Sequence, residues 1–211
     1  MFQDRNDATR QLAMRLGAYR GMTPLVLAIP RGAVPMCRTL AKLLQGDFDV
    51  VLVRKLRAPY QPELAIGAID ESGWSTLAPY AAEIGADADY IAEEQRQQLR
   101  TLDARRAMYS PLRKAIDPAG RVVIVVDDGL ATGSTMIAAL HSVRQRQPKR
   151  LVCAVPVSSP EALEKVRPLA DEVVCLLAPE HFQAVGQFYR DFPQVEDDEV
   201  VALLRTGGSP G

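Results

Sequence analysis

Short apolar runs alternate with amphipathic stretches along most of the chain. The runs at 24–30, 48–55, 121–126, 150–157 and 172–178 have the length and the β-branched content of buried strands. Stretches at 6–20, 34–45, 134–147 and 160–168 show helical spacing, and a more polar helix is expected at 87–107. Strands that alternate with helices in this way predict an α/β fold, in which a parallel twisted sheet is flanked by helices.

Two regions depart from this alternation. Residues 56–75 are interrupted by prolines and glycines, so we expect a long excursion there, with a candidate short strand at 64–69. Connections of this length are usually functional or disordered. Residues 181–204 form an aromatic and acidic tail.

Composition narrows the class of protein. With 211 residues the chain is expected to form a single domain, and its net charge of -1 indicates no general attraction to nucleic acid or to anionic membranes. No apolar run has the length of a membrane span, and the polar start lacks the apolar core of a signal peptide. Cys37, Cys153 and Cys175 are scattered in apolar surroundings, so we expect buried thiols and a cytoplasmic location.

Candidate chemistry is concentrated in the segment VVIVVDDGLATGST, residues 122–135. Gly129 and Gly133 allow backbone N–H groups to point inward, and the helix expected to begin near Ser134 adds its positive end, so this loop suits a phosphate monoester. Asp127 and Asp128 would repel that phosphate but suit the vicinal hydroxyls of a sugar. A ribose 5-phosphate satisfies both halves of the segment.

Other interpretations of this segment are weaker. A P-loop requires a lysine before the Ser/Thr, and a dinucleotide-binding loop requires the G-x-G-x-x-G spacing; neither is found here. A receiver domain places acidic residues at strand ends but does not need the phosphate loop. A plain strand-to-helix turn with a helix cap would be favoured for two acids alone, but not for the whole pattern.

The same segment resembles the ribose-phosphate signature of type I phosphoribosyltransferases. AIPRGAVP (28–35) resembles the pyrophosphate loop of that family, and VVLVRKLRAPYQPELAIGAI (50–69) resembles the start of its mobile catalytic loop. Together with AVGQFYRDF (184–192), these stretches are similar to a group of bacterial proteins known as predicted phosphoribosyltransferases. The resemblance covers about residues 2–203. It implies one domain over 1–211, with a core at about 22–178, a hood from about 1–20 and 179–204, and a mobile loop at about 56–75.

The resemblance also implies roles for individual residues. Asp127 and Asp128 would bind the ribose hydroxyls, Arg31 and Gly32 would bind pyrophosphate, and Arg54 and Lys55 would be catalytic by reaching the leaving pyrophosphate. The 5-phosphate would lie against Ala131, Thr132, Gly133, Ser134 and Thr135. Arg57 and Tyr60 depart from the family pattern, which has glycines there, so the loop is stiffer than usual or Arg57 adds a phosphate contact.

The implied reaction is transfer of a 5-phosphoribosyl group between phosphoribosyl pyrophosphate and a nitrogen base, in nucleotide or nucleoside metabolism. Mg²⁺ would be held mainly by the substrate, with Asp127 and Asp128 acting through water. The alternative is a non-catalytic regulator that binds phosphoribosyl pyrophosphate or a nucleotide. Regulators that bind nucleic acid usually carry an extra domain or a basic face, which this sequence lacks. Nucleotide hydrolysis or phosphorolysis at the same site is a third possibility.

The acceptor base is less well indicated. Enzymes of this family that act on 6-oxopurines often have an aspartate at the position of Ala131, and the loop is more similar to that of adenine enzymes. Phe182 and Tyr189 are candidate stacking surfaces for the base, although aromatic residues more often pack a hood against the core. His181 and Glu63 are candidate proton carriers, with a surface histidine and a solvated charge as the simpler interpretations. The direction of the reaction and the oligomeric state, for which a homodimer is one expectation, stay open.

Overall fold

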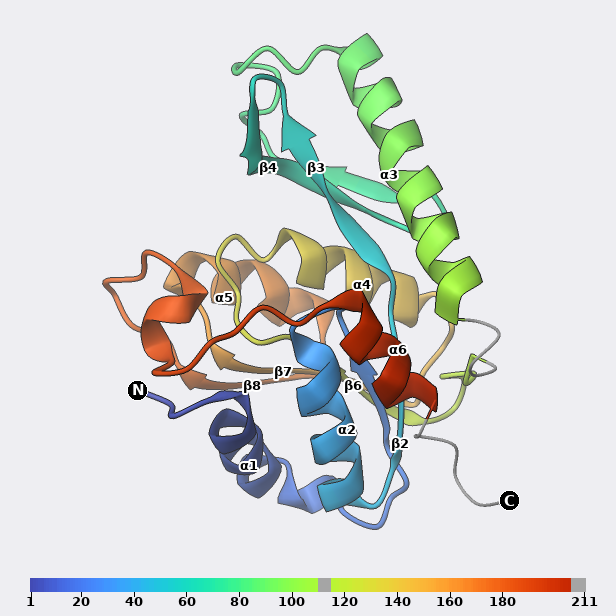
Figure 1. Ribbon diagram of the computed structural model, residues 1–211, viewed down its shortest axis with the longest axis vertical. Helices are drawn as coiled ribbons and strands as arrows, with labels where there is room; N and C mark the ends of the chain where they lie inside the picture. The colour runs from blue at the N-terminus through green and yellow to red at the C-terminus, as the bar shows by residue number, and fades with distance from the viewer. Residues whose placement is uncertain (110–114, 206–211) are drawn as a thin grey trace.

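A five-stranded parallel sheet forms the centre of the protein. The computed structural model describes residues 1–109 and 115–205 (Figure 1). The sheet has the strand order β2-β1-β6-β7-β8, which confirms the predicted α/β fold with a parallel sheet flanked by helices. Its strands are β1 (Leu25–Ala28), β2 (Asp47–Val50), β6 (Val122–Val126), β7 (Arg150–Val157) and β8 (Glu172–Leu177).

Helices cover both faces of this sheet, because alternate strand residues point to opposite sides. Val26 and Ile124 pack in one apolar cluster with α1 (Arg5–Arg15) and α2 (Ala33–Leu44). Their neighbours Leu27 and Val125 pack in a second cluster with α4 (Ser134–Arg144) and α5 (Pro160–Val166). Figure 1 shows the two pairs of helices on opposite sides of the sheet. Short 3-10 turns follow α1 (Gly17–Tyr19) and α5 (Arg167–Leu169).

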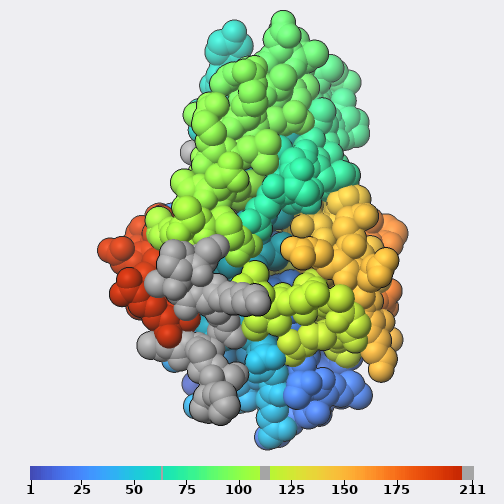
Figure 2. Space-filling view, turned by 90° about the vertical axis from the view of Figure 1, so that its right-hand side faces the viewer, coloured from blue at the N-terminus to red at the C-terminus, as the bar shows by residue number. Residues whose placement is uncertain are grey.

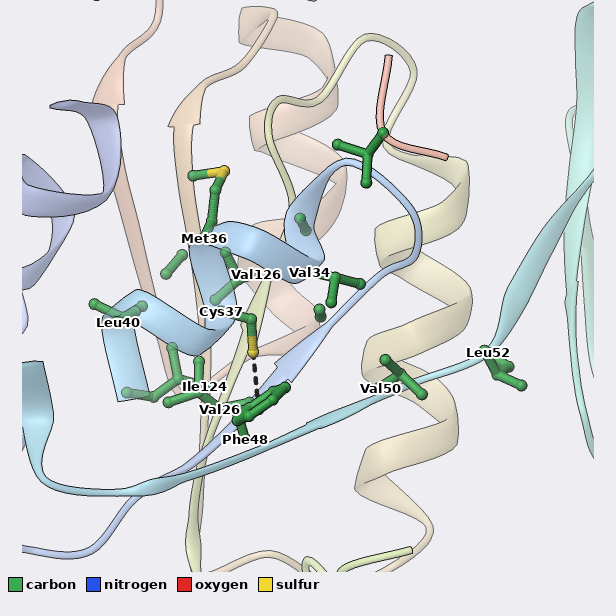
Figure 3. Close-up of a cluster of buried hydrophobic side chains, with 14 of the residues drawn as sticks. Val26, Val34, Met36, Cys37, Leu40, Phe48, Val50, Leu52, Ile124 and Val126 are labelled. Atoms are coloured by element: carbon green, nitrogen blue, oxygen red, sulfur yellow. Dashed lines mark hydrogen bonds between the residues drawn. The ribbon is translucent and has the colours of Figure 1, made fainter. Parts of the chain in front are cut away.

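The cluster under α2 shows how tightly this core is packed. Met36, Cys37 and Leu40 of α2 are buried in this cluster, and the Cys37 thiol donates a hydrogen bond of 3.0 Å to the carbonyl oxygen of Val26 (Figure 3). Cys37 and Cys153 are buried as predicted, whereas Cys175 is only half-buried. None of these three described cysteines forms a disulfide. None of the described helices is long and apolar enough to cross a membrane.

A second sheet and a long helix form an arm, residues 53–109, that projects from the core. The sheet contains β3 (Val53–Ala58), β4 (Gln61–Asp70) and β5 (Ser75–Leu77), and α3 (Ala88–Tyr109) packs along it. Figures 1 and 2 show the arm as a lobe above the core. The chain does leave the parallel sheet here, and the short strand expected at 64–69 lies within the longer β4. The single strand predicted at 48–55 was wrong, because the chain leaves the parallel sheet after Val50 and begins β3 at Val53.

Arg57 ties the hairpin of the arm to α3. Its Nε and Nη2 atoms donate hydrogen bonds of 2.8 and 3.0 Å to the two carboxylate oxygens of Glu94, which is buried. Its backbone N–H donates to the same carboxylate at 2.9 Å, and Tyr90 donates to its carbonyl oxygen at 2.9 Å. Tyr60, at the tip of the hairpin, is fully exposed with a φ of 63°.

The two terminal regions of the chain are joined beside the core. The backbone N–H of Phe2 donates to the carbonyl of Phe188 at 2.8 Å, and that of Arg190 donates to the carbonyl of Phe2 at 2.9 Å. The ring of Tyr189 packs between Phe2 and Phe192, at centroid distances of 5.3 and 4.6 Å. The C-terminal segment contains the 3-10 turn η3 (Val185–Phe188) and helix α6 (Asp197–Arg205). Residues from both ends of the sequence therefore meet next to the carboxyl ends of the strands.

Candidate active site

The register of the central strands brings three segments of the chain together. Ala28 at the end of β1 pairs with Val50 of β2 on one side and with Val126 of β6 on the other. The residues that follow each of these three strands therefore leave the sheet at the same level. Between β1 and β6 the strand order reverses direction, and ligands of open α/β sheets bind outside such a switch point.

An open cavity of about 270 Å³ lies at this point, and most of the predicted site residues line it. Asp127, Asp128, Arg31, Gly32 and Lys55 all line it. The remaining lining residues are Ile29, Pro30, Gly129, Ala131, Thr132, Gly133, Thr135 and Val185. Ser134, which is not among them, begins α4 directly behind the loop, with its hydroxyl 3.2 Å from that of Thr132. The structure thus brings the predicted ribose, phosphate and pyrophosphate segments to one cavity.

The loop from Gly129 to Gly133 is anchored from behind. The N–H of Leu130 donates to the carbonyl of Val157 at 2.9 Å, and the Ser159 hydroxyl donates to the carbonyl of Ala131 at 2.8 Å. Gly133 has a φ of 80°, a conformation that glycine adopts without strain, and it immediately precedes the first turn of α4. The positive end of that helix and the hydroxyls of the loop are features that suit an anion.

Gly133→Val is expected to weaken the binding of ribose 5-phosphate and of phosphoribosyl pyrophosphate equally, by about tenfold or more. The reason is that the charged phosphate loses hydrogen bonds from the backbone of the loop. A Cβ atom at position 133 would lie 3.4 Å from the Cβ atom of Ala162 on α5, and the φ of 80° is strained for valine, so the loop backbone has to shift away from its phosphate-binding conformation. Isothermal titration calorimetry with both compounds measures the effect. Gly120→Val is the matched control, since Gly120 also has a positive φ (68°) but precedes β6, at the opposite end of that strand from Asp127. A loss confined to the pyrophosphate compound would reverse the assignment and give the loop to pyrophosphate.

The two carboxylates are held close together and largely buried. The N–H of Asp128 donates to Asp127 Oδ1 at 2.9 Å, and Arg5 donates to Asp128 Oδ2 from Nε at 3.1 Å and from Nη2 at 2.9 Å. Burial and the neighbouring Asp128 carboxylate raise the pKa of Asp127 well above its ordinary value. Burial also raises the pKa of Asp128, while the charge of Arg5 opposes that rise. Arg5, which the sequence did not suggest as a site residue, is therefore part of the site.

Lys55 and Arg54 lie on opposite faces of β3, so only one of them reaches the cavity. The exposed Lys55 lines the cavity, and its charge partly opposes the burial that raises the pKa values of both aspartates. Arg54 points to α3, where its Nε donates a hydrogen bond of 2.9 Å to Gln98. Arg57 is likewise bound to α3 through Glu94 rather than directed at the cavity. The structure does not bring Arg54 together with the other predicted site residues, and the phosphate contact considered for Arg57 is replaced by a contact with Glu94.

The predicted pyrophosphate loop is also distinctive in its packing. The peptide bond between Pro30 and Arg31 is cis. A Cβ atom at Gly32 would lie 2.1 Å from Asp128 Oδ2, so only glycine allows the carboxylate to lie against this loop. The Arg31 guanidinium lies 3.2 Å from Glu196 and 3.6 Å from Asp197, at the start of the α6 region.

The aromatic residues of the tail do not line the cavity. Tyr189 is buried, and its hydroxyl donates a hydrogen bond of 2.6 Å to the backbone carbonyl of Asp128. The stacking role predicted for Tyr189 is therefore corrected to a packing role. Phe182 packs on Phe188 at a centroid distance of 5.4 Å. Val185 lines the cavity instead, with its methyl groups against Gly129.

The candidate proton carriers add little to this geometry. His181 is exposed and is not among the residues that line the cavity. The side chain of Glu63 lies outside the described part of the structure. Within the described residues, no group of three or more histidine, cysteine or acidic side chains lies close enough together to hold a metal ion. Among the described residues that line the cavity, the acidic ones are Asp127 and Asp128.

Comparisons with known proteins agree with this geometry. The phosphoribosyl transferase domain family matches residues 3–193. A Mycobacterium tuberculosis protein, named as an inferred phosphoribosyl transferase, is 45% identical over 206 residues, which are 97% of this chain and 46% of that protein. The uracil phosphoribosyltransferase of Clostridium perfringens is 33% identical over 133 residues, 63% of this chain and 54% of that enzyme. The chain thus spans about half the length of the curated relatives it matches.

A solved structure covers nearly the whole chain. The crystal structure of TT1426 from Thermus thermophilus has a TM-score of 0.82 and 44% sequence identity, with 99% of each chain covered. The family match also spans all three segments that converge at the cavity, from Arg31 through Lys55 to the loop after β6. On this evidence the chain belongs to the phosphoribosyl transferase domain family.

Proposed function

We propose that the protein transfers a 5-phosphoribosyl group between phosphoribosyl pyrophosphate and a nitrogen base, with release of pyrophosphate in the forward direction. The observation that carries this proposal is the cavity in which two adjacent carboxylates, the loop from Gly129 to Gly133 and the segment of Arg31 and Gly32 meet beside Lys55. Each of these parts suits a different portion of one substrate. The membership of the chain in the phosphoribosyl transferase family supports the same reaction.

The carboxylates have acceptor atoms that suit a vicinal diol. Asp127 accepts a hydrogen bond at Oδ1 and Asp128 accepts two at Oδ2. Within the described residues, no side chain donates a hydrogen bond to the second oxygen of either carboxylate. These two oxygens can accept hydrogen bonds from the 2- and 3-hydroxyls of ribose, while the 5-phosphate lies in the loop from Ala131 to Thr135.

Lys55 is proposed as the catalytic cation. The bond between C1 of the ribose and the pyrophosphate oxygen breaks through an oxocarbenium-like state, so negative charge builds on the leaving oxygen. Positive groups and N–H donors that are already in place stabilise that charge. Lys55, Arg31 and the backbone at Gly32 surround the part of the cavity where the pyrophosphate would lie. A catalytic role for Arg54 stays a prediction. It would require Arg54 to exchange its hydrogen bond with Gln98 for one with the substrate.

Magnesium is proposed to accompany the pyrophosphate substrate. Two carboxylates with unoccupied oxygens are hard ligands of the kind that Mg²⁺ prefers, and Mg²⁺ usually keeps several waters and binds through only one or two carboxylates. Asp127 and Asp128 would therefore contact the ion through water. When bound, the ion neutralises part of the charge on the leaving pyrophosphate. Closure of the hairpin of the arm over the cavity, which would keep water from the oxocarbenium-like state, stays a prediction.

A screen of nitrogen bases identifies the acceptor. Each base is incubated with phosphoribosyl pyrophosphate, Mg²⁺ and the protein, and pyrophosphate release is followed. Uracil belongs in the screen because of the relatives from Clostridium perfringens, and adenine because of the loop sequence around Ala131. We expect release with at least one base, and none with the Asp127→Asn, Asp128→Asn double variant. Tight binding of phosphoribosyl pyrophosphate without release from any base would instead support a non-catalytic regulator.

A further inference from the structure

Arg5 is largely buried at the N-terminal end of α1, an unusual place for a cation. It is the first residue of α1, and the preceding Asp4 caps the helix by accepting a hydrogen bond of 2.7 Å from the N–H of Asp7. A cation in the first turn of a helix meets the positive end of the helix dipole, which is unfavourable. The Arg5 side chain is nevertheless only 11% exposed, so its partners must compensate for this position.

The partners of Arg5 come from the candidate site and from the C-terminal segment. Nε and Nη2 both donate to Asp128 Oδ2, and Nη1 donates to the carbonyl oxygen of Pro193 at 2.7 Å. The guanidinium carbon lies 3.8 Å from the centroid of the Phe192 ring, which is the geometry of a cation–π contact. The guanidinium is therefore held from three sides, by Asp128, Pro193 and Phe192.

These contacts restrict the orientation of Asp128. Both hydrogen bonds from Arg5 go to Oδ2. A Cβ atom, which Gly32 lacks, would lie 2.1 Å from the same oxygen, so Oδ2 lies directly against the backbone of Gly32. The Tyr189 hydroxyl donates to the backbone carbonyl of Asp128, so the main chain is also held by the C-terminal segment. With Oδ2 engaged by Arg5, Oδ1 is the oxygen of Asp128 that accepts no hydrogen bond from a described side chain.

We propose that Arg5 is a positioning residue that holds Asp128 so that its Oδ1 is available to a hydroxyl of the bound ribose. The inference rests on the proposed function, because it assigns a ribose to the cavity. It assigns to the two ends of the chain a role in sugar recognition: α1 supplies the guanidinium, and Phe192 and Pro193 hold it in place. Arg5 itself does not contact the substrate.

The test compares sugars that have the same charge and differ by one hydroxyl. The probes are ribose 5-phosphate, 2-deoxyribose 5-phosphate and 3-deoxyribose 5-phosphate, and the measurement is the ratio of dissociation constants, deoxy over ribose. A general loss of fold or of positive charge changes all three constants and leaves the ratios unchanged. In the unaltered protein we expect at least one ratio to be about ten or more, as for a hydrogen bond to a charged group.

Arg5→Met is expected to bring that ratio close to one, because Asp128 is then free to turn away from the hydroxyl. Arg5→Lys keeps the charge but not the paired donors, so we expect an intermediate ratio. Phe192→Leu should lower the ratio less than Arg5→Met, and should have no further effect in the Arg5→Met background. This variant also keeps the test decisive if Arg5→Met does not fold. Arg190→Ala is the control, since Arg190 joins the same two terminal segments through Gln3, 3.3 Å away, and does not touch the cavity.

The possible results separate this inference from the proposed function. Unchanged ratios in Arg5→Met and Phe192→Leu, in a protein that discriminates between the sugars, would overturn the role of Arg5 alone. An equal fall of the ratios in Arg190→Ala would also overturn it, because the joined termini would then act only as a scaffold. A protein that binds none of the three sugar phosphates and releases no pyrophosphate with any base would overturn the proposed function itself.

Discussion

Replacing both Asp127 and Asp128 by asparagine is expected to abolish binding of phosphoribosyl pyrophosphate while the protein stays folded. The ribose hydroxyls lose their charged acceptors, and a hydrogen bond to a charged group contributes more than one to a neutral amide. The fold is expected to tolerate the change, because asparagine keeps an acceptor oxygen for Arg5 and for the N–H of residue 128. Burial raises the pKa values of both carboxyl groups, which means that their charges are unfavourable where they lie.

Calorimetric titration with phosphoribosyl pyrophosphate and Mg²⁺ measures the loss, and thermal unfolding of the same sample checks the fold. Mutual repulsion of the two acids alone would make the double variant more stable. The ion pair of Asp128 with Arg5, at 2.9 Å, works against that gain, so we expect little net change in the unfolding temperature. Asp103→Asn, which alters an exposed acid on α3, is the control. Unchanged affinity in the double variant would remove the ribose from these carboxylates.

Lys55→Ala is expected to lower turnover by about a hundredfold or more, the usual effect of removing one preorganised contact with developing charge. Its ammonium group helps most when negative charge builds on the departing pyrophosphate, so the loss should fall mainly on kcat. Binding of phosphoribosyl pyrophosphate should weaken less, because the proposed contacts with the phosphate loop and with Arg31 would still hold the ground state. Steady-state kinetics and equilibrium binding are measured side by side, with the base that the screen identifies.

The control for this variant is Lys149→Ala, an exposed lysine that precedes β7, at the opposite end of the sheet from the cavity. Equal losses in turnover and in affinity would show that Lys55 binds the ground state and the transition state uniformly. Full activity would transfer the role to another cation. Arg31 would then be the first candidate, since it lines the cavity, whereas Arg54 and Arg57 are hydrogen-bonded to α3.

Much of the core and of the phosphate half of the site could be predicted from sequence, because both depend on local patterns. The apolar runs that became β1, β6, β7 and β8 are continuous, and period and length are sufficient to recognise a buried strand. The segment from Val122 to Thr135 carries the strand, both acids and the loop within 14 consecutive residues. No long-range contact is needed to place those groups beside one another.

The division of 48–55 into two strands could not be predicted in this way. Residues 47–50 and 53–58 are both strand-like, but the first segment pairs with β1 and the second with β4 in a different sheet. The sequence shows that each segment can form a strand, and not which partner it finds. The same uncertainty applied to Arg54 and Lys55, because adjacent residues of a strand point to opposite faces. The packing of β3 against α3 in the arm turns Arg54 toward α3 and leaves Lys55 on the face of β3 that meets the cavity.

Short-range periodicity and contiguous motifs were sufficient to predict the fold class, the family and the residues that follow β1 and β6. The contributions from residues far apart in the sequence became visible only in the folded protein. Arg5 reaches Asp128 across 123 positions of sequence, Tyr189 turns inward to the carbonyl of Asp128, and Val185 rather than an aromatic ring lines the cavity. The physical reason is that packing of the two chain ends against the sheet depends on the shape and charge of surfaces formed only after folding, and no local pattern records them.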